Sequence, residues 1–291
     1  MAAIAKPPLV IFTDPGKDVD DTFALMLAAE SDKYDLRAVI SANEDAAGNV
    51  ARYARMLLNA MGKEQIPVYQ GEPGNRRPHL LCEVDDAIPK QNEGYLEAIQ
   101  ELSRTSEKVY VLGIAAMSGM AKLTEQTWFD PERFELYQMG GKIGNWEYNV
   151  GGDPKASQKV LDASKDMHFV TSNTTFQKPM QVGRDSQLHQ YITRRAKEGN
   201  KAFGLLLDNW NAFVTYYDTR GFFPYLSDAL AFSALEKDFV SFEKKKIKIE
   251  KSDGFIQLDE AGKEVLLSTE TVDTAGFIDY LLKRLDKITS E

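Results

Sequence analysis

Residues 9 to 29 read LVIFTDPGKDVDDTFALMLAA, and this stretch predicts both the fold and the place of the functional site. It begins with a short apolar run over 9–12, typical of a buried strand, and ends in a helical pattern over 21–30. The turn between them carries four aspartates: Asp14, Asp18, Asp20 and Asp21. A strand that leads through a polar turn into a helix is typical of an open α/β sheet, whose ligands bind beyond the carboxyl ends of the strands.

The four carboxylates of this turn fall within eight positions. They repel one another unless protons or a cation compensate their charge. Clustered carboxylate oxygens are the ligands of hard divalent ions such as Ca²⁺. Aspartates before a helix also cap its first turn and favour the positive end of its dipole, but capping accounts for one or two of them and not for four. The turn therefore predicts a metal site.

The composition narrows the class of protein. The chain has 291 residues, 43% of them hydrophobic, and its 35 basic and 44 acidic residues give a net charge of −9. This balance disfavours nucleic acid and anionic membranes as partners, because both require basic surfaces. The single cysteine, Cys82, excludes an internal disulfide and fits a reducing compartment. No secretory signal and no apolar run of bilayer length are visible, so we expect a cytoplasmic protein.

Strand-like and helical patterns alternate along the chain. Strands are predicted at 9–12, 36–40, 68–69, 109–112, 136–139 and 169–171. Helices are predicted at 21–30, 49–60, 95–105, 117–125, 154–163, 185–195, 202–218 and 226–235. This alternation predicts a Rossmann-like α/β fold, an open and mostly parallel mixed sheet flanked by helices. Right-handed crossovers then bring the carboxyl ends of the strands to one edge.

The last fifty residues have a different pattern. Residues 244–249 alternate charged and apolar side chains, and Asp253-Gly254 separates them from a second short run at 255–258. This arrangement predicts an antiparallel hairpin, followed by an amphipathic helix near 275–288. We expect one domain over residues 1–291, with 241–291 as a C-terminal hairpin and helix elaboration.

Three further segments follow predicted strands and are expected at the same edge: 41–45, 113–119 and 139–149. Glycine-rich turns among them let the backbone approach a ligand closely. In the third segment, Asn145, Glu147 and Asn149 offer partners for hydroxyl groups. The aromatic residues Trp146 and Tyr148 lie between them, as in pockets that stack on sugars or bases.

Asp228 opens a helical pattern near the C-terminal third of the chain. It could be an ordinary first-turn helix acid, which is common. Alternatively, it could close the metal site as a carboxylate from distant sequence. The sequence leaves both interpretations open.

Taken together and in order, these motifs resemble those of the inosine-uridine nucleoside hydrolase family over nearly the whole chain. The family has an Asp-x-Asp-Pro-Gly-x-Asp-Asp turn after its first strand, to which Asp14-Pro15-Gly16 and Asp20-Asp21 are similar. The other matching segments are 66–71, 111–121, Met139-Gly140-Gly141, 144–149, Asp153-Pro154 and Ser227-Asp228.

The resemblance implies the nucleoside hydrolase fold and a calcium-dependent glycosidase that hydrolyses a ribonucleoside to ribose and free base. It implies that Asp14, Asp21, Asp228 and the carbonyl of Ser118 bind the Ca²⁺, and that Asp14 is also the general base on the attacking water. It further implies ribose contacts from Asp20, Asn145, Glu147 and Asn149. The family asparagine after the second strand has no exact counterpart, and Asn43, Glu44 or Asp45 could take its place. Family members are commonly homodimers or homotetramers.

The chain departs from the family in the acidic turn, where Lys17 and Asp18 look inserted. An ungapped pairing would instead put Gly16 at the position of the base and predict a damaged site, with Asp18 as a substitute. The gapped pairing is preferred, because it matches Asp14-Pro15-Gly16 without a break.

A second departure concerns the leaving base. Ser227 occupies the place of a histidine that protonates the base in many members, and a serine hydroxyl is a weak acid near neutral pH. Some purine-specific members activate the base by aromatic stacking instead. The candidates for that role here are Trp146, Trp210, Phe223 and Tyr225.

Two alternative functions follow from the same residues. One is a non-hydrolytic descendant that binds a nucleoside or sugar. The other is a phosphoryl-transfer enzyme that uses Asp14, which is disfavoured because such turns need an aspartate where Gly16 lies.

Overall fold

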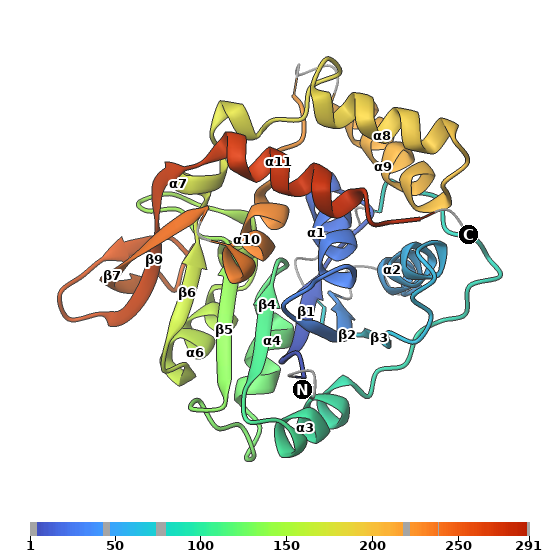
Figure 1. The fold of residues 1–291 in the computed structure, drawn as a ribbon. Helices are drawn as coiled ribbons and strands as arrows, with labels where there is room; N and C mark the ends of the chain where they lie inside the picture. Colours follow the sequence, from blue (N-terminus) through green and yellow to red (C-terminus); the bar gives the residue numbers. More distant parts are fainter. Residues whose placement is uncertain (1–4, 43–46, 74–79, 218–221, 238, 290–291) are drawn as a thin grey trace.

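The apolar runs of the sequence form the strands of one sheet. The computed structural model describes residues 5–42, 47–73, 80–217, 222–237 and 239–289 (Figure 1). These residues form a nine-stranded sheet in the order β3-β2-β1-β4-β5-β6-β9-β7-β8, with helices on both faces. The predicted fold class, an open and mostly parallel mixed sheet, is confirmed.

The first six strands are parallel, and all six were predicted. They are β1 (Pro8–Thr13), β2 (Asp35–Ser41), β3 (Val68–Gln70), β4 (Val109–Gly113), β5 (Phe134–Met139) and β6 (Met167–Val170). Each pairs with its neighbour in parallel register, as in Ile11↔Leu112 between β1 and β4. The strand order reverses between β1 and β4, and this reversal opens a crevice beyond their carboxyl ends.

The C-terminal hairpin is confirmed, as β7 (Val240–Ile249) pairs antiparallel with β8 (Ile256–Leu258). A third strand, β9 (Lys263–Val272), was not predicted; it is antiparallel to β7 and parallel to β6. The sequence of β9 contains a polar residue at a buried position, so it lacks the apolar pattern of a strand. This residue, Ser268, is buried because its hydroxyl accepts a hydrogen bond from the Thr171 amide (3.0 Å) and lies 2.7 Å from the Thr174 hydroxyl.

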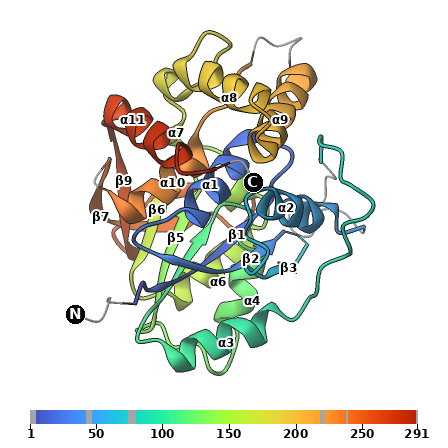
Figure 2. The same ribbon diagram turned by 45° about the vertical axis from the view of Figure 1, so that its right-hand side comes forward.

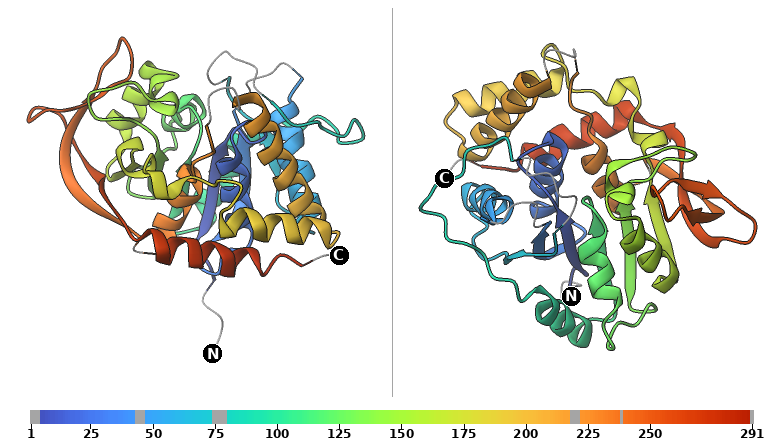
Figure 3. Two further views of the ribbon diagram at one scale, coloured as in Figure 1. Left: turned by 90° about the horizontal axis from the view of Figure 1, so that it is seen from above. Right: turned by 180° about the vertical axis from the view of Figure 1, so that it is seen from behind.

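The helices lie in two layers on the two faces of the sheet (Figures 2 and 3). One face is covered by α3 (Tyr95–Thr105), α4 (Ser118–Thr124) and α6 (Pro154–Ala163). On the other face lie α1 (Val19–Ala29), α2 (Asn49–Ala60) and α10 (Ser227–Glu236). Against these helices pack α9 (Lys201–Tyr217) and α11 (Thr274–Leu285), and α8 (Gln187–Lys197) packs on α9 and α11. Sequence patterns missed the short helices α5 (Tyr148–Gly151) and α7 (Ser172–Thr175) and the 3₁₀ turn η1 (Lys178–Met180). No helix in the described ranges has the length and apolar character needed to cross a bilayer.

Strand β1 shows why its sequence is continuously apolar. Leu9 and Ile11 pack into the core under α1, whereas Val10 and Phe12 pack into the core on the opposite face. A strand buried on both faces needs apolar residues at every position rather than at alternate ones. The first polar residues of this segment are Thr13, which ends β1, and Asp14, which follows it, and they mark the point where the strand reaches the crevice.

Helices α1 and α10 lie side by side and are fastened at their C-terminal ends by α11 (Figure 1). The buried Glu236 carboxylate of α10 accepts hydrogen bonds from Ser31, from the Tyr280 hydroxyl (2.6 Å) and from Arg284 (2.7 Å). Arg284 also donates to the carbonyl of Glu30 at the end of α1 (3.1 Å). One buried ion pair thus joins the three helices.

Replacing Arg284 with methionine would leave the buried Glu236 carboxylate without its cation. Breaking a buried pair from one side costs about 3–5 kcal/mol, so we expect the free energy of unfolding in urea to fall by that amount. The control Lys283→Met breaks only the exposed pair with Asp279 and should cost no more than about 1 kcal/mol. Equal losses in the two variants would contradict the assigned role of the buried pair.

Candidate functional site

A cavity of about 280 Å³ opens at the switch point of the sheet. It is lined by residues at or just after the carboxyl ends of β1, β4 and β5, and by residues of α5, α9 and the first turns of α1 and α10. One half is acidic and is lined by Asp14, Asp18, Asp20, Asp21, Glu147 and Asp228. The other half is aromatic and is lined by rings that contact one another: Phe176, Phe213, Tyr217, Phe222 and Tyr225. The Tyr148 ring also lines the cavity, but it lies in α5 between Glu147 and Asn149.

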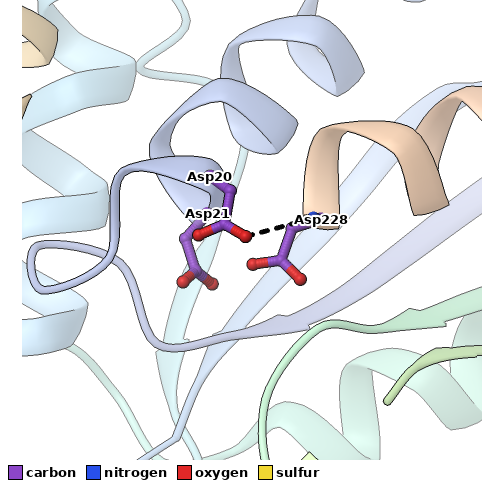
Figure 4. Close-up of side chains that lie close together, drawn as sticks. All are labelled: Asp20, Asp21 and Asp228. Carbon is purple, nitrogen blue, oxygen red and sulfur yellow. Dashed lines mark hydrogen bonds between the residues drawn. The ribbon is translucent and has the colours of Figure 1, made fainter. Parts of the chain in front are cut away.

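Three carboxylates form the centre of the acidic half (Figure 4). Asp20 and Asp21 lie in the first turn of α1, and Asp228 lies in the first turn of α10. One oxygen of each lies within 4.8 Å of the others, and the side chains are only 9, 3 and 4% exposed. The amide of Asp228 donates a hydrogen bond to Asp20 (3.3 Å), which links the two helices at this end. Asp228 is therefore more than a helix-capping acid, because the fold brings it to the acidic turn.

The turn before α1 is shaped to present these acids. Gly16 has φ +101°, and a Cβ on it would lie 2.3 Å from Leu80, so glycine is needed there. Asp21 accepts hydrogen bonds from the Thr13 hydroxyl (2.6 Å) and from the Asp14 amide (3.1 Å). These contacts hold the end of β1 against the start of α1 and leave Asp14 at the cavity wall.

Burial and mutual repulsion govern the charge state of the cluster. Burial raises the pKa of Asp20 well above its usual value, and the charges of Asp18 and Asp21 raise it further. Burial and then the charges of Asp20 and Asp21 likewise raise the pKa of Asp228. A hard divalent cation among these oxygens would favour the ionised forms instead, and a set of carboxylate oxygens suits Ca²⁺. The donor set fits the metal that the sequence predicts.

Glu147 and Asn149 line the cavity as expected, and both are held by the backbone. Glu147 caps α5, accepting from the amides of Gly141 (2.6 Å), Asn149 (3.0 Å) and Val150 (3.1 Å). The side-chain amide of Asn149 donates to the carbonyl of Met139 at the end of β5 (3.1 Å). Positive φ angles at Gly140 and Gly141 allow the tight turn that brings this segment back under the strand.

Several other predicted site residues do not line this cavity. Ser118 donates to Asp153 (2.9 Å) and lines a separate cavity between α4 and α6. Asn145 and Trp146 are exposed on the loop before α5, and the edge of the Trp146 ring packs on Tyr148. Asn43 lies outside the described residues.

Trp210 corrects the sequence interpretation most clearly. This residue of α9 is completely buried in the hydrophobic core, where its indole N–H donates to the carbonyl of Val182 (3.1 Å) and its ring packs on His189. A side chain without exposed surface cannot stack on a bound base. The stacking candidate Phe223 is half-buried against the same core, whereas Tyr225 does line the cavity.

The sequence missed most of the aromatic half. Phe176 stacks on Tyr225 with centroids 4.9 Å apart, and Phe222 packs on the same ring at 5.8 Å. Phe213 and Tyr217 contact each other at 4.6 Å one helical turn apart on α9. Aromatic residues at helical spacing usually face the hydrophobic core. The sequence therefore did not distinguish Phe213 and Tyr217, which line the cavity, from Trp210, which is buried on the same helix.

The chain matches the family model described as inosine-uridine preferring nucleoside hydrolase over residues 9–279. Among curated proteins, no match to the chain was found.

Solved structures of nucleoside hydrolases share the fold. A purine-preferring ribonucleoside hydrolase from Gardnerella vaginalis is 17% identical, with a TM-score of 0.81 over 97% of this chain and 98% of that one. An inosine-uridine preferring nucleoside hydrolase from Bacillus anthracis is 16% identical, with a TM-score of 0.76 over 97% and 100% of the two chains. A plant nucleoside hydrolase is 18% identical, with a TM-score of 0.73 over 97% and 99%.

The raised pKa values of Asp20 and Asp228 predict how the melting temperature depends on pH in a chelator. The folded state holds protons on these carboxyls more tightly than the unfolded chain, in which they titrate near 3.8. Their contribution to stability is therefore fully present below the unfolded pKa and is lost progressively as pH rises from there through the folded pKa. Asp228→Asn removes one charge, so we expect its melting temperature to fall less than the wild type's between about pH 5 and about pH 8.

The same two proteins are also compared with and without added Ca²⁺. At 100 times its dissociation constant, Ca²⁺ should raise the wild-type free energy of unfolding by about 2.7 kcal/mol, and Asp228→Asn should lose most of this gain. Parallel pH profiles, together with no response to calcium in either protein, would contradict the cation site.

Proposed function

The chain belongs to the inosine-uridine preferring nucleoside hydrolase family and is an N-ribosyl hydrolase, and we propose that it uses calcium to hydrolyse a ribonucleoside to ribose and free base. The observation that carries the proposal is the buried cluster of Asp20, Asp21 and Asp228 at the switch point of the sheet. The cluster shares its cavity with an aromatic wall, so the two halves offer separate places for a ribose and a base.

The proposed metal ligands are Asp21, Asp228 and Asp14, with Asp20 beside them. Asp21 and Asp228 belong to the clustered carboxylates, and Asp14 lines the same cavity close enough for its charge to raise the pKa of Asp228. A Ca²⁺ ion bound there supplies a positioned, more acidic water and contacts for ribose hydroxyls. The backbone carbonyl of Ser118 is the further ligand that the family resemblance implies, whereas the Ser118 side chain lines another cavity.

Asp14 is the proposed general base. Its carboxylate takes a proton from the water that attacks the anomeric carbon, as the bond from that carbon to the base nitrogen breaks. Positive charge then develops on the ribose ring, and the surrounding carboxylates, Asp20 and Glu147 among them, stabilise it. Asp20 and Asn149 are the proposed partners of the ribose hydroxyls, since both line the acidic half.

The aromatic half is the proposed site of the base. Tyr225 packs on both Phe176 and Phe222, and the three rings line the same cavity as Asp228. Planar heterocycles stack favourably on such rings. The name of the Gardnerella relative, a purine-preferring enzyme, makes a purine riboside the first substrate to test.

We further propose that residues 1–291 form one domain, and that the protein is a cytoplasmic homodimer or homotetramer. The net charge of −9 and the single cysteine support a cytoplasmic localisation. The oligomeric state rests on the family resemblance alone.

The decisive measurement is release of free ribose from a panel of purine and pyrimidine nucleosides. We expect activity that is lost in a chelator and restored by calcium chloride, and Asp14→Ala should lower kcat by about 10²–10⁴-fold through loss of the base. The control Asp162→Ala removes an exposed acid on the distant helix α6 and should leave the rate unchanged. A metal-replete enzyme that releases no ribose from any nucleoside, but is stabilised by them, would instead be a binding protein.

Removing one ring of the aromatic wall tests the base site. Stacking is worth about 0.5–1.5 kcal/mol, so Tyr225→Ala should raise KM for a purine riboside by roughly 3–10-fold. Tyr216→Ala is the matched control, because Tyr216 is 54% exposed on α9 and does not line the cavity. If both variants change KM equally, the base binds elsewhere.

A further inference from the structure

The base departs with negative charge, which a nearby positive charge would stabilise. Most of the charged residues that line the cavity, however, are acidic. When the bond between the anomeric carbon and the base breaks, the electron pair stays on the base nitrogen. The carboxylates that stabilise a positive ribose repel this negative charge. Among the described lining residues, six are acidic and one, Lys17, is basic.

The backbone of Lys17 is anchored on the aromatic side of the cavity. Its carbonyl accepts a hydrogen bond from Asn209 of α9 (3.0 Å), and Asn209 is in turn held by the Thr22 hydroxyl (2.6 Å). Phe213 of the aromatic wall lies one helical turn after Asn209. The segment that lengthens the acidic turn is thus tied to the helix that carries part of the base site.

The side chain of Lys17 extends to the opposite wall. Its ammonium lies 4.6 Å from the centroid of the Tyr148 ring, between the ribose candidates Glu147 and Asn149 in sequence. In the part of the chain that the structure describes, Lys17 forms a cation–π contact and no ion pair with a carboxylate. Lys17 therefore extends from the helix that carries part of the aromatic half to the segment that carries Glu147 and Asn149. In the proposed function, the bond between base and ribose lies between these two parts of the cavity.

The other polar group on this side is a poorer candidate. The Ser227 hydroxyl lines the cavity beside Asp228, is buried, and has no hydrogen-bond partner among the described residues. It can donate a hydrogen bond but carries no charge. A charged donor forms a hydrogen bond about twice as strong as a neutral donor does, so an ammonium stabilises developing negative charge better than a hydroxyl.

We propose that Lys17 is a catalytic residue that stabilises the departing base, an inference that rests on the proposed function. Its ammonium donates a hydrogen bond to the base as the electron pair of the broken bond moves onto the ring nitrogen. The oxygen of the attacking water bonds to the anomeric carbon, and its proton goes to Asp14. That proton then returns through solvent to the base, so the products are ribose and the neutral base.

The test compares two leaving groups. Lys17→Met is assayed on two substrates. The base of inosine is a poor leaving group, because its negative charge is poorly stabilised. The p-nitrophenolate of p-nitrophenyl β-D-ribofuranoside is a good leaving group, because its negative charge is delocalised. We expect kcat/KM for inosine to fall by about 100-fold or more, the loss typical of removing one preorganised donor, while the nitrophenyl substrate stays close to wild type. Lys17→Arg keeps the charge and should recover part of the activity on inosine.

Lys178→Met is the matched control, because it removes one positive charge from the exposed turn η1 beside the cavity without lining it. Melting temperatures of all variants check that the fold is intact.

Equal losses on both substrates, or no loss on either, would overturn the role of Lys17. So would a wild-type preference for inosine 5′-phosphate over inosine that Lys17→Met abolishes, because Lys17 would then bind phosphate. A wild type inactive on both ribosides would refute the proposed function itself, and the role of Lys17 with it.

Discussion

Repulsion among the buried carboxylates of Asp20, Asp21 and Asp228 is the constraint on which the rest of the structure depends. Their oxygens lie within 4.8 Å of one another, at the first turns of two neighbouring helices. Helices α1 and α10 nevertheless pack side by side. The hydrogen bond from Asp228 to Asp20 links them at the site, and the buried pair of Glu236 and Arg284 fastens them at the far end.

The same arrangement explains the division of the cavity. Helix N-termini and strand ends at the switch point supply polar groups, whereas α9, the end of α7 and the segment before α10 supply aromatic rings. An N-glycosidic substrate has the same two parts, a polar sugar and an aromatic base. Lys17 reaches from one half to the other, and it is contributed by the turn that also carries the acids.

Local patterns were a good guide wherever local physics decides the structure. The apolar run before Thr13 had to be a strand buried on both faces, and the acids after it had to lie at the edge of the sheet. Glu147 and Asn149, expected after a strand end, line the cavity, but the short helix that the Glu147 carboxylate caps was not predicted. Strand β9 was missed because its buried hydroxyls are satisfied by partners about a hundred residues away, on the segment after β6.

The sequence by itself determined the parallel sheet, the acidic turn and the family, since these depend on apolar periodicity and on motifs within a few residues. Only the tertiary structure decided which side chains share the cavity. Trp210 and Phe213 are three positions apart on one helix, yet one is sealed in the core and the other lines the site. The helical pattern marks both as inward-facing, and what each side chain meets there is set by how α9 packs against segments far away in the sequence.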